Sequence, residues 1–363
     1  FEYTEETEAF ETVMLQNEMA LWCSRWDTVN GGEQQNQKFI TPVKFNYIQQ
    51  YHYLNKDKKI GEYLDQTLEN IALSGIVDHL EGGFYRYTVD PEWKIPHFEK
   101  MLYDNAQLLT LFSNAYKEFK KPLFKSTVYS IFDFLNNRME NSQGAFYSAI
   151  DADNDQGEGR YYVFNAEEIK TVGGEDLNLL QDYYQIDLDK PFEEEYYHLR
   201  KSTDLNTLSL KYKLTEKQLN EKRADWENQF AALKNEREFP LIDKKIITPW
   251  NALTVSGLLN AYGAFSDDSF LKQAKQTFTF IEDHLIRRKK LMHTFQANEA
   301  KMEANLEDYA FTIKAALDLY QNTGGQAYLD RAVQLTQTAI KNFENDENPF
   351  FTFTENPVLF SEI

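Results

Sequence analysis

Apolar residues along most of the chain recur every three to four positions, the period of a helix with a buried face. This pattern predicts ten helices, over residues 5–25, 43–55, 60–79, 98–119, 122–140, 214–234, 250–265, 268–287, 306–322 and 326–344. The alternation of a β-strand is rare. We expect one β-hairpin, in which 160–164 pairs with 145–148 across an acidic turn. The stretch 165–213 is the least regular, and there we expect an excursion with short helices.

The helices repeat in pairs. Residues 105–116 begin with Asn-Ala and end with Asn-Ala-Tyr, and residues 251–262 carry the same residues at the same spacing. A weaker third copy places Ala310 and Tyr320 at the corresponding positions. Eight residues after each of these tyrosines an aromatic residue opens the next helix, namely Phe124, Phe270 and Tyr328. The repeating unit is therefore a helical hairpin with a short connection.

A single hairpin cannot bury both of its faces, so the hairpins must stack on one another. Leu108, Leu109, Leu111 and Phe112 cannot share one narrow stripe, which indicates an inner helix with neighbours on several sides. We predict an all-α fold, an (α/α)6 toroid, as a single domain over residues 1–363; an open helical solenoid is the alternative. Ten helices fall short of twelve, so we expect the last hairpin to be missing from this sequence.

Charge and composition exclude several classes of function. The 58 acidic and 38 basic residues give a net charge of −20, which argues against general binding to nucleic acid or to anionic lipid. One cysteine, Cys23, excludes an intrachain disulfide and a cysteine-based zinc site. We find no apolar run of 18 residues and no nucleotide-binding motif, and we name no metal and no cofactor. A cytoplasmic location is the default expectation.

In such a ring, the loops that precede the inner helices line one funnel. The richest loop runs from Asp78 to Asn105 and contains His79, Arg86 and His97. On a helix that begins near Pro96, His97, Lys100 and Asp104 would share one face, and Glu99 and Tyr103 another. A histidine beside a carboxylate can act as a general acid or base near neutral pH. The alternative is that His97 caps the helix and that the charges form a buried structural network.

Three further loops carry candidate chemistry. Asp151 and Asp153 lie on an acidic turn, which suits acid–base work or is simply solvated. Thr248 and Pro249 are typical of a helix start, so Trp250 and Asn251 would lie at the funnel mouth, as a sugar-binding platform or as packing residues. Asp308 either caps its helix or projects into the funnel. We assign catalytic roles to His97, Glu99, Asp104, Asp151 and Asp153, and substrate binding to His79, Arg86, Tyr103, Trp250, Asn251 and Asp308.

The remaining polar residues belong to one further loop or are expected to have structural or surface roles. The segment from Trp26-Asp27 through Gly31-Gly32 to Pro42 looks like another loop of the same kind. Cys23 is expected to be structural. The remaining histidines have no partner pattern and are expected at the surface or in packing, namely His52, His198, His284 and His293.

With these loops the sequence resembles the thioredoxin-domain-containing family that includes the bacterial YyaL proteins and spermatogenesis-associated protein 20. The resemblance rests on 75–84, 96–106, 151–153, 245–251 and 308–310, and it covers about residues 22–340. It implies a six-hairpin toroid similar to N-acylglucosamine 2-epimerases and six-hairpin glycosidases, joined to an N-terminal thioredoxin-like domain. We expect that domain to be absent from this chain. Tyr85 stands where the family usually has a second histidine, and 187–205 fits only loosely.

The leading expectation is a carbohydrate-active protein, epimerase-like or glycoside-hydrolase-like. His97 would be the acid/base, oriented by Glu99 or Asp104, and Asp151 or Asp153 would act from across the funnel. The expected ligand is a sugar-like small molecule, with no nucleic acid and no membrane. The rival expectation is a non-catalytic binding or scaffold module, with a thioredoxin-like domain as its partner.

Overall fold

A computed structural model describes residues 12–193, 195–201, 205–287, 290–344 and 350–354. Its helices are α1 Thr12–Cys23, α2 Pro42–Asn55, α3 Lys58–Leu73, α4 Leu102–Phe119, α5 Pro122–Phe134, α6 Ala166–Gly173, α7 Leu177–Tyr184, α8 Leu205–Tyr212, α9 Glu216–Asn235, α10 Thr248–Phe265, α11 Asp268–Phe280, α12 Leu306–Thr323 and α13 Gln326–Phe343. No helix among these residues is both long and apolar enough to cross a bilayer. All ten predicted helices are present, although residues 5–11 of the first lie outside the described part.

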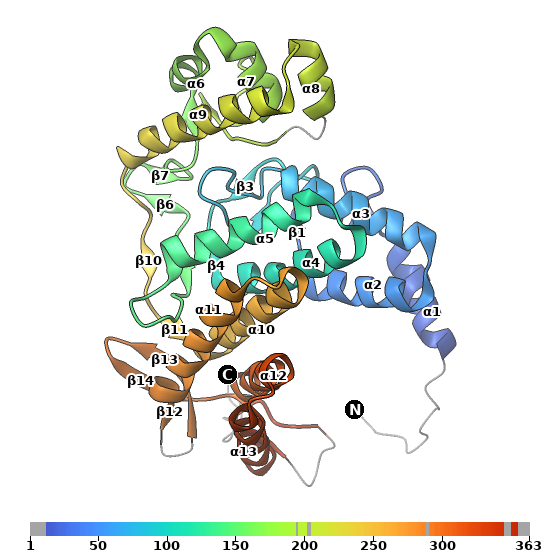
Figure 1. Cartoon of the computed structure of the whole chain (residues 1–363), viewed down its shortest axis with the longest axis vertical. Coiled ribbons are helices and arrows are strands. Elements are labelled where there is room, and N and C mark those ends of the chain that lie inside the picture. Colours follow the sequence, from blue (N-terminus) through green and yellow to red (C-terminus); the bar gives the residue numbers. More distant parts are fainter. Residues whose placement is uncertain (1–11, 194, 202–204, 288–289, 345–349, 355–363) are drawn as a thin grey trace, which may run out of the picture.

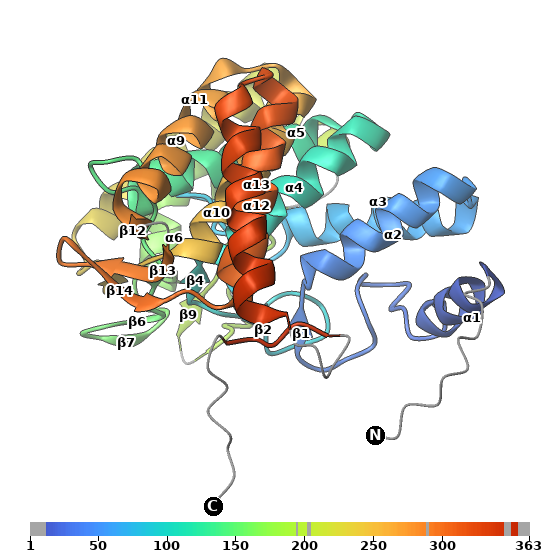
Figure 2. The same ribbon diagram turned by 90° about the horizontal axis from the view of Figure 1, so that it is seen from below.

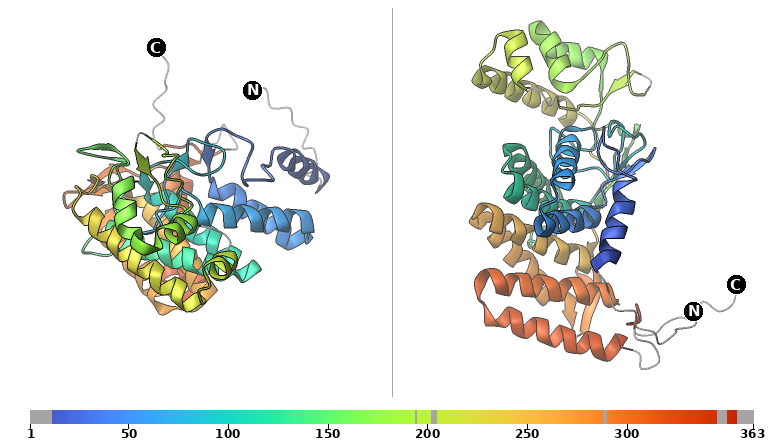
Figure 3. Two further views of the ribbon diagram at one scale, coloured as in Figure 1. Left: turned by 90° about the horizontal axis from the view of Figure 1, so that it is seen from above. Right: turned by 90° about the vertical axis from the view of Figure 1, so that its right-hand side faces the viewer.

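Helical hairpins stack side by side to form the body of the protein (Figure 1, Figure 3). They are α2–α3, α4–α5, α10–α11 and α12–α13. The first helices of the hairpins pack in succession, α2 on α4, α4 on α10 and α10 on α12, and each second helix covers its own partner from outside. Figure 2, seen from below, shows α12 and α13 as the last hairpin of the row. This arrangement confirms the all-α fold class of the (α/α)6 toroid type.

The hairpins identified as repeats in the sequence also share helix lengths and helix ends. The helices α4, α10 and α12 each have 18 residues. Both α5 and α11 have 13 residues and end in a five-residue π-helical turn, at Leu135–Met139 and Ile281–Leu285. Gly257 permits the close approach of α10 to α4, because a Cβ there would lie 2.4 Å from the carbonyl oxygen of Ala106.

Short strands connect the hairpins at one end of the inner helices. They are β1 Lys38–Phe39, β2 Tyr87–Thr88, β3 Pro96–His97, β4 Lys100–Met101, β5 Ala149–Ile150, β6 Asp153–Asn154, β7 Gly157–Glu158, β8 Phe164–Asn165, β9 Tyr196–Tyr197, β10 Ile242–Asp243, β11 Ile246–Ile247, β12 Ile286–Arg287, β13 Lys290–Gln296 and β14 Glu299–Glu303. They form antiparallel sheets in the orders β1-β2-β3, β10-β5-β4, β11-β13-β12 with β14 beside β13, β6-β7 and β8-β9.

Two predictions about this region are wrong. The predicted hairpin of 145–148 with 160–164 does not form, because β5 pairs with β4 and β10, and β8 pairs with β9. The helix predicted to begin near Pro96 begins at Leu102, because residues 96–97 and 100–101 pair as strands. His97, Lys100 and Asp104 therefore do not share a helix face.

The excursion is a lobe with its own core (Figure 1). Phe164, Tyr184, Trp226 and Phe230 belong to this second core, which is separate from that of the hairpins. Because Trp226 and Phe230 lie on α9, the lobe extends beyond the predicted limit of residue 213 and includes the long helix at 216–235.

Two loops have the same internal construction. Asp27 and Asp78 each cap the turn that follows, and each lies four residues before a Gly-Gly pair. A buried lysine closes each loop. Lys38 Nζ donates to Asp27 Oδ2 and to the carbonyl of Gly31, and Lys100 Nζ donates to Asp78 Oδ2 and to that of Gly82. The four glycines have positive φ, from 75° to 82°, a conformation that other residues rarely adopt.

Candidate functional site

A row of rings crosses the sheet of β1, β2 and β3. Phe39 pairs with Tyr87, and Tyr87 pairs with His97, so the three side chains lie beside one another on one face of the sheet. The ring centroids of Phe39 and Tyr87 are 4.8 Å apart, and Tyr87 stacks on His97 at 4.9 Å. This aromatic row is partly open to solvent, with Phe39 47% exposed.

His97 lies between two carboxylates. Its Nδ1 is 2.6 Å from Glu158 Oε1, and its Nε2 is 3.8 Å from Glu99 Oε2. The sequence pointed to Glu99 but not to Glu158, which lies 61 positions away and reaches His97 through the β6–β7 hairpin. The only signal in the sequence was the acidic turn itself, in which Gly157 permits the reversal.

A chain of polar contacts leads from this histidine to the start of α10. The guanidinium of Arg86 donates to Glu99 Oε2 at 3.0 Å, and its charge opposes the rise that burial causes in the pKa of Tyr103. The ring of Tyr103 meets that of Trp250 edge-on at 4.9 Å. The structure therefore brings together Arg86, Glu99, Tyr103 and Trp250 at the N-terminal ends of α4 and α10.

Asp104, in the first turn of α4, has the most unusual environment of these residues. Its Oδ2 is buried and has no hydrogen-bond partner among the described residues. Burial raises the pKa of this carboxyl to about 7, while the cation of Arg86 opposes the rise and Glu99 adds to it. A carboxyl of this kind exchanges a proton near neutral pH, which is the property that a general acid or base needs.

Asp151 and Asp153 do not lie across the funnel from His97. Asp151 directly follows β5, the strand paired with β4, and Asp153 lies in β6, which pairs with the strand that carries Glu158. Both side chains are exposed. The expectation of an opposed acid/base at these positions is therefore corrected, because the strand pairing puts them on the same side as His97, and Glu158 makes the contact instead.

Asn251 does not face a ligand. Its Oδ1 accepts from the backbone N–H of Phe146, and its Nδ2 donates to the carbonyls of Phe146 and Ile247. The residue is 0% exposed. The predicted role in substrate binding is wrong, because both polar atoms of the side-chain amide already form hydrogen bonds with backbone groups.

His79 and Lys100 also serve the structure. His79 Nε2 lies 2.8 Å from the carbonyl oxygen of Ser74, and burial lowers the pKa of this histidine to about 3. The predicted contact of His79 with substrate is therefore not supported by its geometry. The buried cations Lys100 and Lys234 both contact Asp78; burial alone would raise the pKa of Asp78, but these two ammonium groups outweigh it and lower the pKa.

Asp308 caps α12 and holds a histidine. Its Oδ2 accepts from the backbone N–H of Asn305 at 2.7 Å, and both of its oxygens lie within 3.0 Å of His293 Nδ1. Asp308 is 0% exposed, so it does not project into the funnel, and of the two predicted roles it has the capping one. The hydrogen bond that His293 donates to Asp308 raises the pKa of this histidine, against the effect of burial. The sequence missed this pair, since β13 brings His293 to Asp308 by tertiary structure.

The described residues contain no group of three or more His, Cys, Asp or Glu side chains that could hold a metal ion. The chemistry that this arrangement offers is proton transfer by Asp104 and His97, next to a cation at Arg86 and to aromatic surfaces at Tyr87 and Trp250.

The sequence comparisons find similar proteins in animals. The chain is similar to spermatogenesis-associated protein 20. It is 29% identical to the protein of Homo sapiens over 358 residues, which is 88% of this chain and 45% of the relative. It is 31% identical over 333 residues to the uncharacterized protein B0495.5 of Caenorhabditis elegans, covering 80% of this chain and 44% of the relative. The chain thus spans less than half the length of these relatives. No family model matches the sequence.

Solved structures are similar in fold. The Lin0763 protein from Listeria innocua matches with a TM-score of 0.51 at 12% identity, over 87% of this chain and 63% of that one. A sugar epimerase from a ruminal bacterium matches with a TM-score of 0.40 at 12% identity, over 92% and 87%. At such low identity, likeness concerns the fold alone.

Proposed function

We propose that this protein is an acid–base catalyst acting on carbohydrate, with its reaction centre at the N-terminal end of α4. The observation that carries the proposal is Asp104, whose buried and unpartnered Oδ2 and pKa of about 7 are combined with a position beside Arg86 and Tyr103. A buried carboxyl without a partner costs stability, and such groups are concentrated at functional sites.

His97 is the second proton-transfer group of the proposal. Glu158, at 2.6 Å from Nδ1, orients the ring, while Glu99 lies on the Nε2 side. A protonated Asp104 is neutral, whereas a protonated His97 carries a positive charge. The pair can therefore supply one group that donates a proton and one that removes a proton.

The aromatic side chains supply the reason for a sugar substrate. Tyr87 and Trp250 present partly exposed rings on either side of the polar cluster. An aromatic ring packs against the apolar C–H face of a pyranose, while Arg86 and Glu99 can exchange hydrogen bonds with its hydroxyl groups. Two reactions fit this set of groups, hydrolysis of a glycosidic bond and epimerisation at a carbon next to a carbonyl.

The test combines a substrate panel with two variants. Purified protein is incubated in D2O with reducing mono- and disaccharides and with aryl glycosides, and the products are followed by proton NMR. Epimerisation through proton abstraction replaces a carbon-bound proton with deuterium, whereas hydrolysis releases a new reducing end without that exchange. We expect Asp104→Asn to lower the turnover at least a hundredfold and to retain the fold.

A matched control is Asp153→Asn, an exposed carboxyl on the same side of the funnel. Wild-type turnover that survives unchanged in Asp104→Asn would overturn the assignment of Asp104. Absence of turnover across the whole panel would favour the second candidate function.

That second candidate is a non-catalytic module that acts beside a thioredoxin-like domain. It is favoured by the finding that this chain matches less than half of its relatives' length, so that these relatives contain further segments with which a hairpin domain can act. Its test is a binding titration with a separately produced thioredoxin-like domain, and absence of turnover by the wild-type protein across the sugar panel is its expected companion result.

A further inference from the structure

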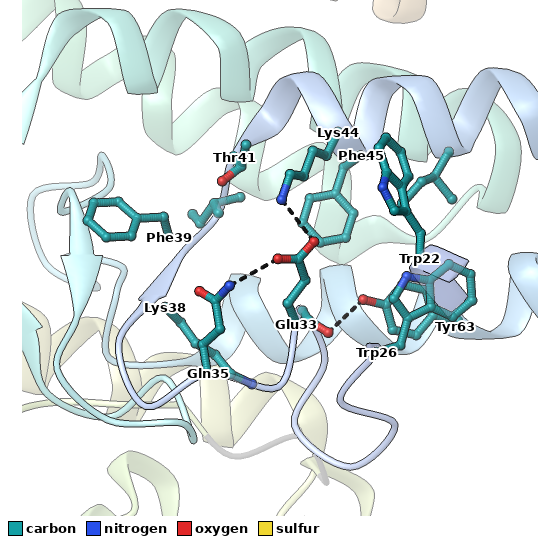
Figure 4. Close-up of a pocket in the computed structure, with 13 residues that line it drawn as sticks. Trp22, Trp26, Glu33, Gln35, Lys38, Phe39, Thr41, Lys44, Phe45 and Tyr63 are labelled. Atoms are coloured by element: carbon teal, nitrogen blue, oxygen red, sulfur yellow. Dashed lines mark hydrogen bonds and ion pairs between the residues drawn. The ribbon is translucent and has the colours of Figure 1, made fainter. Parts of the chain in front are cut away.

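We propose a second binding position, a recess at the start of α2 that takes one uncharged pyranose ring. This inference rests on the proposed function, because it adds a neighbouring subsite to the reaction centre at α4. The recess is a cavity of about 160 Å³ between the end of α1, the 32–41 loop, α2 and α3 (Figure 4). This volume is close to that of an engineered cavity of about 150 Å³ that binds benzene, so the recess is large enough for one small ring.

The wall of the recess is a rigid aromatic surface. Trp26 stacks on Tyr63 with a centroid separation of 3.7 Å and an interplanar angle of 3°. The Tyr63 hydroxyl donates to the carbonyl of Gly32 at 2.8 Å and so fixes the stack (Figure 4). Trp22, half-buried at the end of α1, adds another ring. Such a surface offers an apolar face that loses no conformational freedom when the C–H face of a sugar ring packs on it.

The mouth of the recess is polar and electrically balanced. Glu33 Oε1 forms an ion pair with Lys44 Nζ at 2.8 Å, and Glu33 Oε2 accepts from Gln35 Nε2 at 3.1 Å (Figure 4). All three side chains line the cavity. Paired charges leave no net attraction for an ion, but their remaining donors and acceptors suit hydroxyl groups. This balance points to a neutral ligand rich in hydroxyls.

The backbone at Thr41 is strained where it lines the cavity. Thr41 occupies the N-cap position of α2, yet its φ is +50° and its side chain makes no capping hydrogen bond. Threonine at an N-cap normally has extended backbone and caps the helix, and a β-branched residue with positive φ is an outlier. With this backbone conformation Thr41 lines the recess and does not cap the helix. Backbone strain of this kind is concentrated at ligand sites.

The aromatic row connects the recess to the reaction centre. Phe39 lines the recess and is the first member of the row that continues through Tyr87 to His97. The two steps of 4.8 Å and 4.9 Å join rings that are turned toward each other, so the row presents a continuous strip of ring edges along which a chain of sugar rings can lie. The recess would thus hold one ring of an oligosaccharide while another ring lies at His97, and the two contacts would reinforce each other.

The experiment measures binding by tryptophan fluorescence in a Trp250→Phe background. That background removes the indole at the funnel, so that the reporters near the ligand are Trp22, Trp26 and Trp93, the last of which lies against Gly32 and Lys38 of the lining. The probes are glucose, mannose, N-acetylglucosamine and their β-1,4-linked disaccharides. We expect a saturable change in fluorescence, with a disaccharide bound at least tenfold more tightly than its monosaccharide. Glu33→Gln and Trp22→Ala should each weaken binding at least tenfold, and both lie at the cavity edge, where substitution spares the Trp26–Tyr63 stack.

The matched control is Glu62→Gln, which breaks the exposed Lys58–Glu62 pair on α3. It should leave binding unchanged. Equal affinities for wild-type, Glu33→Gln and Trp22→Ala proteins, or no fluorescence change with any probe, would overturn the recess as a sugar site. Binding that depends on Glu33 but occurs without turnover of any substrate would retain the recess and refute the catalytic proposal. Turnover that requires Asp104 but is unchanged in Glu33→Gln and Trp22→Ala would retain the catalytic proposal and refute the recess.

Discussion

Asn251 binds the backbone of Phe146 through the same hydrogen bonds by which Asn105 binds the backbone of Phe84. In each case Oδ1 accepts from the phenylalanine N–H at 2.8 Å, and Nδ2 donates to its carbonyl and to the carbonyl four residues before the asparagine. Both asparagines are 0% exposed. The repeated Asn therefore ties the first turn of an inner helix to the loop that leaves the preceding hairpin.

This clamp gives a first prediction. Asn105→Ala and Asn251→Ala should each destabilise the protein by roughly 2–4 kcal/mol, because a buried backbone N–H and C=O lose their partners. Urea unfolding followed by circular dichroism measures the change. Asn260→Ala is the control, since that amide makes one helix-internal bond, to the carbonyl of Ser256, and its loss should cost under about 1 kcal/mol. Similar costs for all three would contradict the clamp.

The packing of α4 against α10 gives a second prediction. Gly257→Ala should destabilise by about 1–3 kcal/mol, because the new methyl group would meet the Ala106 carbonyl at 2.4 Å and the helices would have to separate. Gly263 lies in the same helix with its nearest neighbour, Lys117 Nζ, at 3.7 Å. Gly263→Ala should therefore be neutral or stabilise by up to about 1 kcal/mol, as expected for helix propensity alone. Thermal unfolding of the two variants provides the comparison.

A third prediction concerns the change in stability between about pH 4 and pH 7. The folded protein holds a proton on Asp104 up to about pH 7, whereas an unfolded Asp loses it near pH 3.9. Between these values the folded state binds more protons, so the contribution of Asp104 to stability falls as pH rises. Three pKa units correspond to roughly 4 kcal/mol. Asp104→Asn should hence be more stable than wild type at pH 8 and nearly equal to it at pH 4, as measured by urea unfolding at both values.

A fourth prediction separates charge from turn geometry at Asp78. Asp78→Asn keeps the acceptor for the N–H groups of Leu80 and Glu81 but leaves Lys100 and Lys234 without their shared carboxylate. We expect a loss of about 3–5 kcal/mol, the typical effect of breaking a buried ion pair on one side. Asp27→Asn in the equivalent loop leaves one buried lysine, Lys38, without its carboxylate partner. Its loss of stability should therefore be smaller. Equal losses would show that the turn, not the charge, stabilises these loops.

The repeating hairpins were predictable from sequence because they rest on local patterns. Helical periodicity and the spacing of Asn, Ala and Tyr identify α4–α5, α10–α11 and α12–α13 within a few residues of their observed bounds. Asp27 with Gly31-Gly32 was likewise identified as a loop of the kind that precedes α4. These signals survive because each depends on residues close together in the chain.

The site was only partly predictable, for the opposite reason. The polar residues before α4 were identified by their composition, but strand pairing decides which of them meet. Residues 96–101 form strands because they pair with 87–88 and 149–150, partners that periodicity cannot reveal. Glu158 reaches His97, and His293 reaches Asp308, by the same long-range pairing. Asn251 was predicted to bind substrate because an amide side chain forms the same kinds of hydrogen bond with a sugar as with a buried backbone. The sequence does not show which of the two partners is present.

The last prediction concerns acid. Burial lowers the pKa of His79 to about 3 and that of His198 to about 4, and each histidine makes a hydrogen bond to a backbone carbonyl through Nε2. In the unfolded chain both would protonate near pH 6.5, so the unfolded state binds more protons below that value. Their contribution to stability is present above pH 6.5 and is lost progressively as pH falls to about 3–4. In His198→Gln the side-chain amide can still donate to the carbonyl of Gly75, but it does not bind a proton in this pH range. The stability of this variant should therefore fall less steeply than that of wild type between pH 6.5 and 4. The check is a series of urea titrations across this range; parallel curves for the two proteins would show that His198 is already protonated in the fold.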